Sequence, residues 1–330
     1  MANVPPYAVE RQEKVGESGT AVSEARLAGG RILVRRPGAG GAVSRWLDSR
    51  FPLLAIAPTA LVMLAIFGIP LLFSLFLSTQ GWSIEESLFA GRFVGLNNYS
   101  DLLDDPHFVA SVFLTLAYTA ITVAAEMLIG LGVALLLNMN LPFIGFFRTT
   151  LIVPMMMTPI IAALCWKLLL DSKAGVINWF LGRHIVWLGD PLLAQISVGL
   201  VNVWQNAPYV AILLLAGLRS LPSEPLEAAS IDGASRLQIF RHVTLPLLQP
   251  YILVALLLRT IFEFRAFDNV YVMTSGGPGD ATMLLSIFTY MTSFVSFDLS
   301  LAAAASWFML GVALLLCGCF ILALRQGRTR

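Results

Sequence analysis

Six stretches of the chain are each long and apolar enough to cross a membrane as a helix. They cover residues 53–77, 108–137, 149–170, 192–218, 247–274 and 299–324. A spanning helix needs about 20 apolar residues, because the hydrocarbon core of a bilayer is about 30 Å thick. Only 12% of the residues are charged, whereas a typical soluble domain has about 25%. The sequence therefore predicts an all-α membrane protein with six transmembrane helices.

The basic residues that flank these spans predict the orientation of the chain. Fifteen Lys and Arg residues lie before span 1, between spans 2 and 3, between spans 4 and 5, and after span 6, whereas the opposite loops hold three. Cytoplasmic loops carry the excess of Lys and Arg, so both termini and the loop at 223–246 are expected in the cytoplasm. We divide the chain into a largely disordered cytoplasmic N-terminal tail (1–50), a transmembrane domain (51–325) and a cytoplasmic C-terminal tail (326–330).

The polar loop at 223–246, between the fourth and fifth spans, predicts a pair of short helices. Ser223 and Ser235 are suited to cap these helices, and Asp232-Gly233 is a turn signal between them. The second helix would expose apolar side chains, among them Leu237, and such side chains need a partner that buries them. That partner is another protein or, alternatively, the lipid headgroups on which an interfacial helix rests.

The spacing of residues in this loop is more specific than its composition. Glu227-Ala228-Ala229 is followed by Gly233 after three residues, by Val243 after nine more, and then by Leu245-Pro246. This pattern resembles the cytoplasmic coupling loop of permease subunits of binding-protein-dependent ABC importers, with Val243 where the family pattern has Ile. The resemblance implies the type I ABC importer permease fold, with Glu227 meeting a separate ATPase and Gly233 permitting the bend. The ATPase-coupling residues that it implies are Glu227, Ala228, Ala229, Asp232, Gly233, Leu237, Phe240, Leu245 and Pro246.

The fifth span carries four charged residues in an otherwise apolar stretch, namely Arg259, Glu263, Arg265 and Asp268. Each charge would cost roughly 2.5–3.5 kcal/mol at the centre of a bilayer, so the four must be paired or face a cavity. Helical periodicity places Arg259, Glu263 and Phe267 on one stripe, which we assign to the translocation path. Arg265 and Asp268 lie on a different face, where we expect them to form a pair that holds helix packing. The alternative is that both pairs serve packing alone.

The outer half of the fourth span is also polar and ends in Asn206 near Pro208. Amide side chains next to a tryptophan can bind a sugar, but polar residues in membrane bundles also hydrogen-bond between helices, and both interpretations stay open. In the fifth span, RTIFEFRAFDNVYVMTSGGPG (259–279) resembles a segment of carbohydrate-uptake permeases of the maltose and trehalose type. The resemblance implies a sugar as substrate, with a disaccharide such as trehalose or maltose favoured. The candidate substrate-path residues are Asn206, Arg259, Glu263, Phe267, Asp268 and Tyr271.

Several functions are disfavoured by what the sequence lacks. None of its three lysines follows a glycine, so the phosphate-binding loop G-x-x-x-x-G-K-[ST] does not occur. No catalytic motif and no metal-ligand spacing is recognisable, and we predict neither catalytic nor metal-binding residues. The formal net charge of +1 indicates no nucleic-acid partner. We therefore expect a transport subunit that is not itself an enzyme and has no cofactor of its own.

The resemblance also implies the remaining subunits of a transporter. A second homologous permease would form the other half of the pathway, and two copies of an ATPase subunit would bind ATP and Mg. An extracytoplasmic substrate-binding protein or lipoprotein would deliver the substrate, and lipid of a bacterial or archaeal inner membrane would surround the helices. Two alternatives stay open at this point. One is an ion-coupled secondary transporter that uses the charges of the fifth span; the other is import of a glycerol phosphate or phosphodiester by the same ABC machinery.

Overall fold

The computed structural model describes residues 12–15, 21–27, 30–35, 55–82, 91–139 and 142–327, and the chain forms two units, residues 1–72 and 73–330. In the first unit, β1 (Gln12–Val15), β2 (Ala21–Leu27) and β3 (Gly30–Arg35) form an antiparallel sheet in the order β1-β2-β3. Val22 pairs with Lys14 on one side and Arg35 on the other. These strands contain β-branched residues, which favour sheets. The rest of the predicted tail lies outside the described residues, and the expectation of a largely disordered tail stays a prediction.

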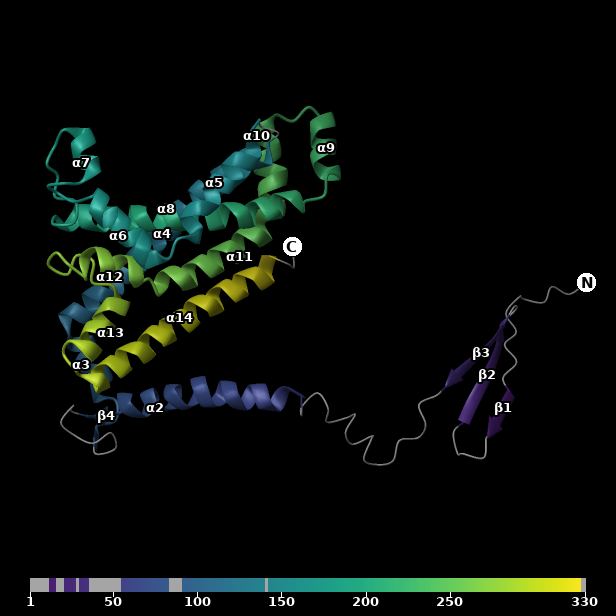
Figure 1. Ribbon diagram of the computed structural model, residues 1–330, viewed down its shortest axis with the longest axis horizontal. Helices are drawn as coiled ribbons and strands as arrows, with labels where there is room; N and C mark the ends of the chain where they lie inside the picture. Colours follow the sequence, from purple (N-terminus) through teal and green to yellow (C-terminus); the bar gives the residue numbers. More distant parts are fainter. Residues whose placement is uncertain are drawn as a thin grey trace, which may run out of the picture. The chain divides into compact units, whose positions relative to one another are not determined.

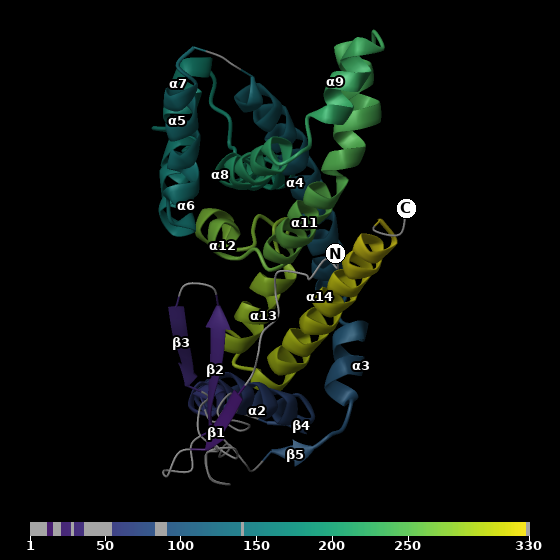
Figure 2. The ribbon, with the colours of Figure 1, turned by 90° about the vertical axis from the view of Figure 1, so that its right-hand side faces the viewer.

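The second unit is almost entirely helical, as Figure 1 and Figure 2 show. A helical segment over Ala55–Ser78, which contains η1 (Leu64–Gly68) and α2 (Ile69–Ser78), leads into it. The elements that follow are β4 (Gln80–Gly81), β5 (Arg92–Phe93), α3 (Asn97–Asp104), α4 (Pro106–Asn138), α5 (Ile144–Met156), α6 (Pro159–Leu169), α7 (Val176–Leu181), α8 (Pro191–Arg219), α9 (Glu224–Ile231), α10 (Arg236–Ile239), η2 (Phe240–Thr244), α11 (Leu245–Phe264), α12 (Asp268–Thr274), α13 (Leu285–Phe294) and α14 (Leu299–Gly327).

Within the described part of the chain, five helical segments are long and apolar enough to cross a membrane, and one bent pair makes a sixth span. The five are Ala55–Ser78, Pro106–Asn138, Pro191–Arg219, Arg236–Phe264 and Leu299–Ala323, and the bent pair consists of α5 and α6. They correspond in order to the six stretches predicted from the sequence. The prediction of a helical membrane protein with six spans is confirmed.

Two of the predicted spans are interrupted in the structure. The third span, expected as one helix over 149–170, is broken between α5 and α6, whose axes differ in direction by 97°. Met157 and Thr158 are extended there, and Pro159 opens α6, since the residue before a proline is driven out of the helical region. The fifth span, expected over 247–274, ends at Phe264, and α12 begins only at Asp268.

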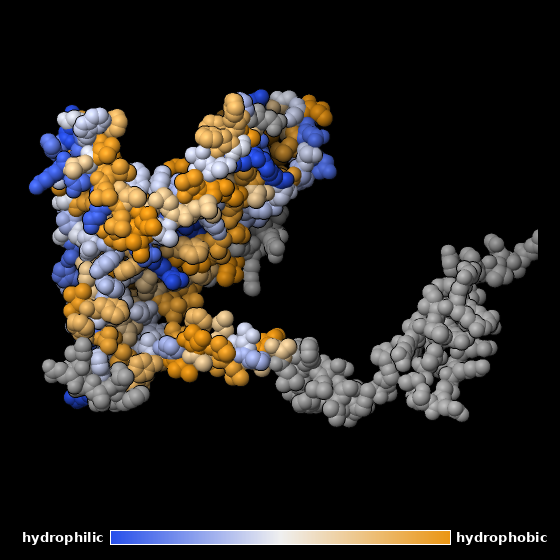
Figure 3. Space-filling model, in the orientation of Figure 1, coloured by the Kyte–Doolittle hydropathy of each residue, from blue (hydrophilic) through white to orange (hydrophobic). Residues whose placement is uncertain are grey.

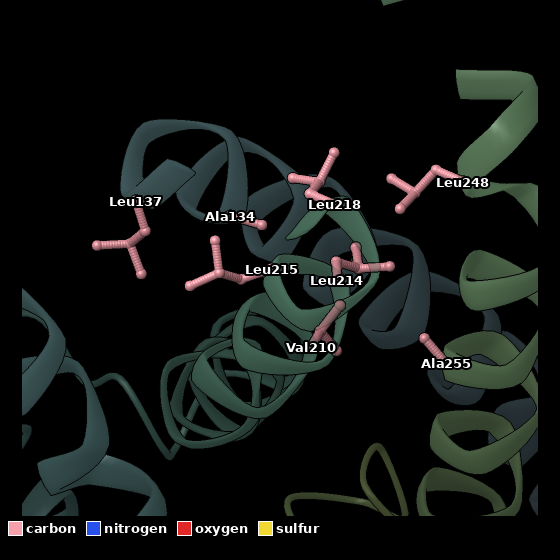
Figure 4. Packing of buried hydrophobic residues seen from close by; sticks show 8 residues of the cluster. All are labelled: Ala134, Leu137, Val210, Leu214, Leu215, Leu218, Leu248 and Ala255. Carbon is pink, nitrogen blue, oxygen red and sulfur yellow. The ribbon is translucent and has the colours of Figure 1, made fainter. Parts of the chain in front are cut away.

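Helices α4 and α8 pack against each other more extensively than any other pair of helices in the second unit. Figure 4 shows a cluster of buried side chains in which α4, α8 and α11 meet. Its members are Ala134, Leu137, Val210, Leu214, Leu215, Leu218, Leu248 and Ala255. Gly130 of α4 faces Val210 of α8 so closely that a Cβ at this glycine would lie 2.6 Å from Val210 Cγ1. The absence of a side chain at Gly130 therefore permits the close approach of the two helices.

Large apolar side chains also cover the outside of the helices. Leu128 of α4 is 73% exposed and Leu168 of α6 is 74% exposed. In Figure 3 such apolar residues, drawn in orange, spread over the helices, whereas hydrophilic residues gather near α7 and α9. An apolar exterior of this kind suits contact with lipid, where backbone groups are satisfied within each helix.

We predict that Gly130→Ala lowers the stability of the folded chain by about 1–3 kcal/mol, because the added methyl group would overpack the contact with Val210. The matched control is Gly132→Ala on the same helix, where an added Cβ meets no atom within 4 Å. Thermal unfolding of the detergent-solubilised protein measures both. Equal melting temperatures for the two variants would contradict the close packing of α4 and α8.

Candidate functional site

The loop between α8 and α11 folds as two helices joined by a tight turn. Gly233, after α9, has a φ of 78°, a left-handed conformation that glycine adopts at little cost. Ser235 then caps α10: its side chain accepts a bond from the N–H of Gln238, and its own N–H donates to Gln238 Oε1 at 2.7 Å. The predicted cap at Ser235 is therefore present. The predicted cap at Ser223 is wrong, because its side chain makes no capping bond. Only its carbonyl accepts, from Leu226 N at 3.0 Å and Glu227 N at 2.9 Å.

The residues of the sequence pattern in this loop lie largely on the surface. Six of them are exposed and three are half-buried; the exposed ones are Glu227, Ala228, Asp232, Gly233, Leu237 and Pro246, and the half-buried ones are Ala229, Phe240 and Leu245. Ile231 is 85% exposed and Leu237 is 73% exposed. A hollow of about 420 Å³ between the two helices is lined by residues that include Asp232, Gly233 and Ile239. The loop thus offers apolar and acidic side chains around a concave surface.

A buried ion pair joins α4 to α11 inside the membrane region. The Nε and Nη2 atoms of Arg259 donate to the two carboxylate oxygens of Glu126, at 2.7 and 2.9 Å. Nη2 of Arg259 also donates to Glu263, one turn further along α11. All three side chains are buried, and a bidentate pair of this kind is both strong and directional. Arg259, which the sequence assigned to the translocation path, is thus paired with a carboxylate of the second span. This partner, Glu126, lies 133 residues earlier in the chain.

Amide side chains of α8 extend this network. Asn202 donates to Glu263 and also to the hydroxyl of Tyr118, the latter at 2.8 Å. Asn206 in turn donates to Asn202 Oδ1 at 2.6 Å. The interhelical role considered for these amides is therefore real for Asn202. In the part of the chain that the structure describes, no group of three or more His, Cys, Asp or Glu side chains is placed to hold a metal ion.

A cleft of about 260 Å³ opens beside the network, at the break between α11 and α12. Four of the six candidate substrate-path residues line this cleft: Asn206, Glu263, Phe267 and Asp268. Arg259 does not line it, because its guanidinium group points to the carboxylates of Glu126 and Glu263. Tyr271 does not line the cleft either, but its ring stacks on that of Phe267 with centroids 5.1 Å apart. Carboxylates, amides and an aromatic face therefore meet at one opening.

The expected pair between Arg265 and Asp268 is not formed among the described residues. Arg265 lies at the end of α11, in a non-helical conformation (φ −102°, ψ 14°), and Asp268 belongs to the next helix. The two residues are therefore not one helical turn apart. Both side chains are exposed, and both line the cleft.

Sequence reasoning missed Asn269, a buried side chain of the cleft that bonds to Gln205, one of the fourth-span amides considered above. Asn269 is buried and donates to Gln205 Oε1 at 2.9 Å, but its own Oδ1 has no hydrogen-bond partner among the described residues. Buried acceptors without a partner are rare and costly. The only sequence signal for Asn269 was its position directly after Asp268 in the segment that resembles carbohydrate permeases.

Comparisons with known proteins agree with this geometry. The family model for the binding-protein-dependent transport system inner membrane component matches residues 126–326. The trehalose/maltose transport system permease protein MalF of Thermococcus litoralis is 36% identical, over 74% of this chain and 84% of that protein. The sulfoquinovosyl glycerol transport system permease protein SmoG of Agrobacterium fabrum is 32% identical, over 86% of this chain and 94% of that protein. A bacterial alginate ABC transporter, solved in complex with an alginate pentasaccharide-bound periplasmic protein, superimposes with a TM-score of 0.74 at 21% identity, over 84% of this chain and 94% of that chain.

Six spans and an exposed loop with the coupling pattern define a transport permease. The chain belongs to the family of binding-protein-dependent transport system inner membrane components, and within it to the carbohydrate-uptake ABC permeases. Its fold is that of the permease subunits of ABC importers. The secondary transporter considered above is therefore set aside.

We predict that Arg259→Met destabilises the folded chain by about 3–5 kcal/mol, because removal of one partner leaves buried charges without compensation. Arg265→Met is the matched control, since Arg265 is exposed and forms no ion pair among the described residues. The melting temperature of the purified protein reports the difference. If both variants melted together, the ion pair with Glu126 would not stabilise this fold.

Proposed function

We propose that this chain forms half of the translocation pathway of an ATP-driven importer of a disaccharide such as trehalose or maltose. The observation that carries the proposal is the cleft between α8, α11 and α12. Beside Glu263, the Asn206 and Asp268 side chains can hydrogen-bond to hydroxyl groups, and the ring of Phe267 offers an apolar face. A sugar presents the matching surfaces, namely hydroxyl groups that both donate and accept and a face of C–H groups. The 36% identical permease of a trehalose/maltose transport system supports the choice of substrate.

The loop at 223–246 is the proposed contact with a separate ATPase subunit, present in two copies that bind ATP and Mg. Its exposed Ile231 and Leu237 are apolar side chains that a protein cleft would bury. Glu227, on the exposed side of α9, is the proposed coupling residue. When the ATPase dimer closes, it moves α9 and α10 and thereby switches the pathway between its inward-facing and outward-facing states. In this arrangement the loop and both termini lie in the cytoplasm, as the distribution of basic residues indicates.

A second homologous permease completes the proposed pathway, and an extracytoplasmic binding protein delivers the sugar. The similar fold of an alginate transporter solved with a sugar-bound periplasmic protein supports the latter partner. Purification of the chain from mild-detergent membranes tests the assembly. We expect an ATPase and a second permease to co-purify, with ATP hydrolysis stimulated by a trehalose-loaded binding protein. A chain that takes up trehalose alone, under an ion gradient, would overturn the proposal.

We predict that Gly233→Pro and Glu227→Arg each abolish uptake while the chain still inserts into the membrane. Proline fixes φ near −65° and cannot adopt the φ of 78° at Gly233, and arginine reverses the charge of the proposed coupling residue. The matched control is Glu224→Arg, a charge reversal at an exposed residue of the same helix outside the sequence pattern. Uptake of radiolabelled trehalose is measured beside the amount of membrane-inserted protein. Normal uptake by either inserted variant would argue against the assignment of this loop.

We predict that Asn206→Ala and Phe267→Ala each raise the KM for trehalose uptake. A lost neutral hydrogen bond is worth about 0.5–1.5 kcal/mol, which corresponds to roughly 2–12-fold in KM. ATP hydrolysis without sugar should stay unchanged. Phe294→Ala is the control for aromatic packing. The ring centroids of Phe294 and Tyr290 are 5.1 Å apart, but Phe294 does not line the cleft. An unchanged KM in both cleft variants would place the sugar elsewhere.

An anionic substrate that contains glycerol is the second candidate. Arg265 lines the cleft, is exposed and forms no ion pair among the described residues, and a 32% identical permease belongs to a sulfoquinovosyl glycerol transport system. The exposed Asp268 in the same cleft counteracts the charge of Arg265. Competition of glycerol 3-phosphate against trehalose uptake distinguishes the two candidates, and the disaccharide proposal expects no competition.

A further inference from the structure

The break in the third span leaves backbone groups that the helix no longer satisfies. Helix α5 ends at Met156, and Met157 is extended (φ −73°, ψ 139°) before α6 begins. Carbonyl groups at the end of a helix need a partner from outside it. For Met157 that partner is a side chain of another span, since Gln205 Nε2 of α8 donates to the carbonyl oxygen of Met157 at 2.9 Å.

The same glutamine also binds the wall of the cleft. Its Oε1 accepts a hydrogen bond from Asn269 Nδ2 of α12 at 2.9 Å. Gln205 is only 4% exposed and Asn269 only 8% exposed, so neither bond competes freely with water. Gln205, Asn269 and Pro159, the first residue of α6, all line the cleft. The buried side chain of Gln205 therefore bonds both to Met157 at the break and to Asn269, whose own Oδ1 is buried without a partner among the described residues.

Both halves of the broken span pack against α8, and each also has a contact with a further helix. On the α6 side, Lys167 Nζ donates to the carbonyl oxygen of Val272 in α12 at 2.8 Å, and Trp166 packs edge-on against Trp204 of α8 with centroids 5.4 Å apart. On the α5 side, Arg148 Nη2 donates to the carbonyl oxygen of Leu137 near the end of α4 at 3.2 Å. Lys167 therefore links α12 directly to α6.

We propose that Gln205 is a positioning residue that fixes the angle between α5 and α6 and makes this angle respond to the occupant of the cleft. A sugar that enters the cleft contacts Asn269 and shifts the amide that Gln205 holds, and Gln205 passes this shift to Met157. The part of this inference that concerns the sugar rests on the proposed function. The part that concerns the angle rests on the two hydrogen bonds of Gln205 alone.

The test measures the angle directly, by pulsed electron spin resonance in the purified transporter with the subunits that co-purify. Spin labels are placed on the native Cys165 of α6 and on Phe146→Cys of α5, both exposed positions, after Cys317→Ser and Cys319→Ser. Distances are recorded with and without a trehalose-loaded binding protein. Gln205→Met keeps the size of the side chain and removes both hydrogen bonds.

Two further variants separate a local effect from a general loss of stability. Gln195→Met is the matched control: it is the same substitution on the same helix and removes a bond of 2.7 Å to the carbonyl oxygen of Ala281, far from the break. Asn269→Leu removes the hydrogen bond between Asn269 and Gln205 but leaves the bond between Gln205 and Met157 in place.

We expect one narrow distance distribution in the parent protein and in Gln195→Met, shifted by the loaded binding protein. Gln205→Met should lose the narrow distribution even without sugar, and Asn269→Leu should keep it but lose the shift. A narrow, responsive distribution in Gln205→Met would overturn the proposal. If Gln205→Met broadens the distribution while trehalose shifts nothing in the parent protein, Gln205 still fixes the angle, and the proposed substrate is wrong.

Discussion

A guanidinium group held by two carboxylates inside the membrane is the interaction on which the transmembrane helices depend. Arg259 of α11 binds both oxygens of Glu126 in α4, and it also binds Glu263. Asn202 then connects Glu263 to α8 and to Tyr118 of α4. Because unpaired charges are so costly in hydrocarbon, these helices have one favourable register relative to each other. The apolar cluster around Leu214 and Leu248 fills the space between the same three helices. Apolar contacts are not directional, so this cluster does not fix the register of the helices as the hydrogen bonds do.

This network also determines which polar side chains remain available to a ligand. The charges on Arg259 and Glu263 are already used between helices, although both residues lie in the span with the most charged groups. The helix ends at Phe264, and the residues between α11 and α12 line the cleft. The exposed charged residues there, Arg265 and Asp268, follow the end of the helix. The charged residues before the break between α11 and α12 thus hold the helices together, whereas those after it remain available to a ligand.

The length of the apolar stretches was sufficient to predict the six spans, and the spacing of Glu227, Gly233 and Pro246 was sufficient to predict the family. The broken helices were not predictable in the same way. Pro154, Pro208 and Pro250 lie inside helices that continue, whereas Pro159 begins a new one. What differs at Pro159 is a partner 48 residues away, Gln205, which satisfies the carbonyl of Met157. Likewise the pairing of Arg259 with Glu126 joins residues distant in sequence, so helical periodicity assigned Arg259 to the path instead.

The pairing of Glu126 with Arg259 has a consequence for the synthesis of the chain. Helix α4 enters the bilayer first, and its partner charge is made 133 residues later. At about 5–20 residues per second, this interval lasts roughly 7–27 s. During that time Glu126 lacks the guanidinium group of Arg259, so α4 either stays beside the translocation channel or carries a protonated carboxyl group. The arrival of α11 then removes the cost of leaving the Glu126 charge unpaired in lipid.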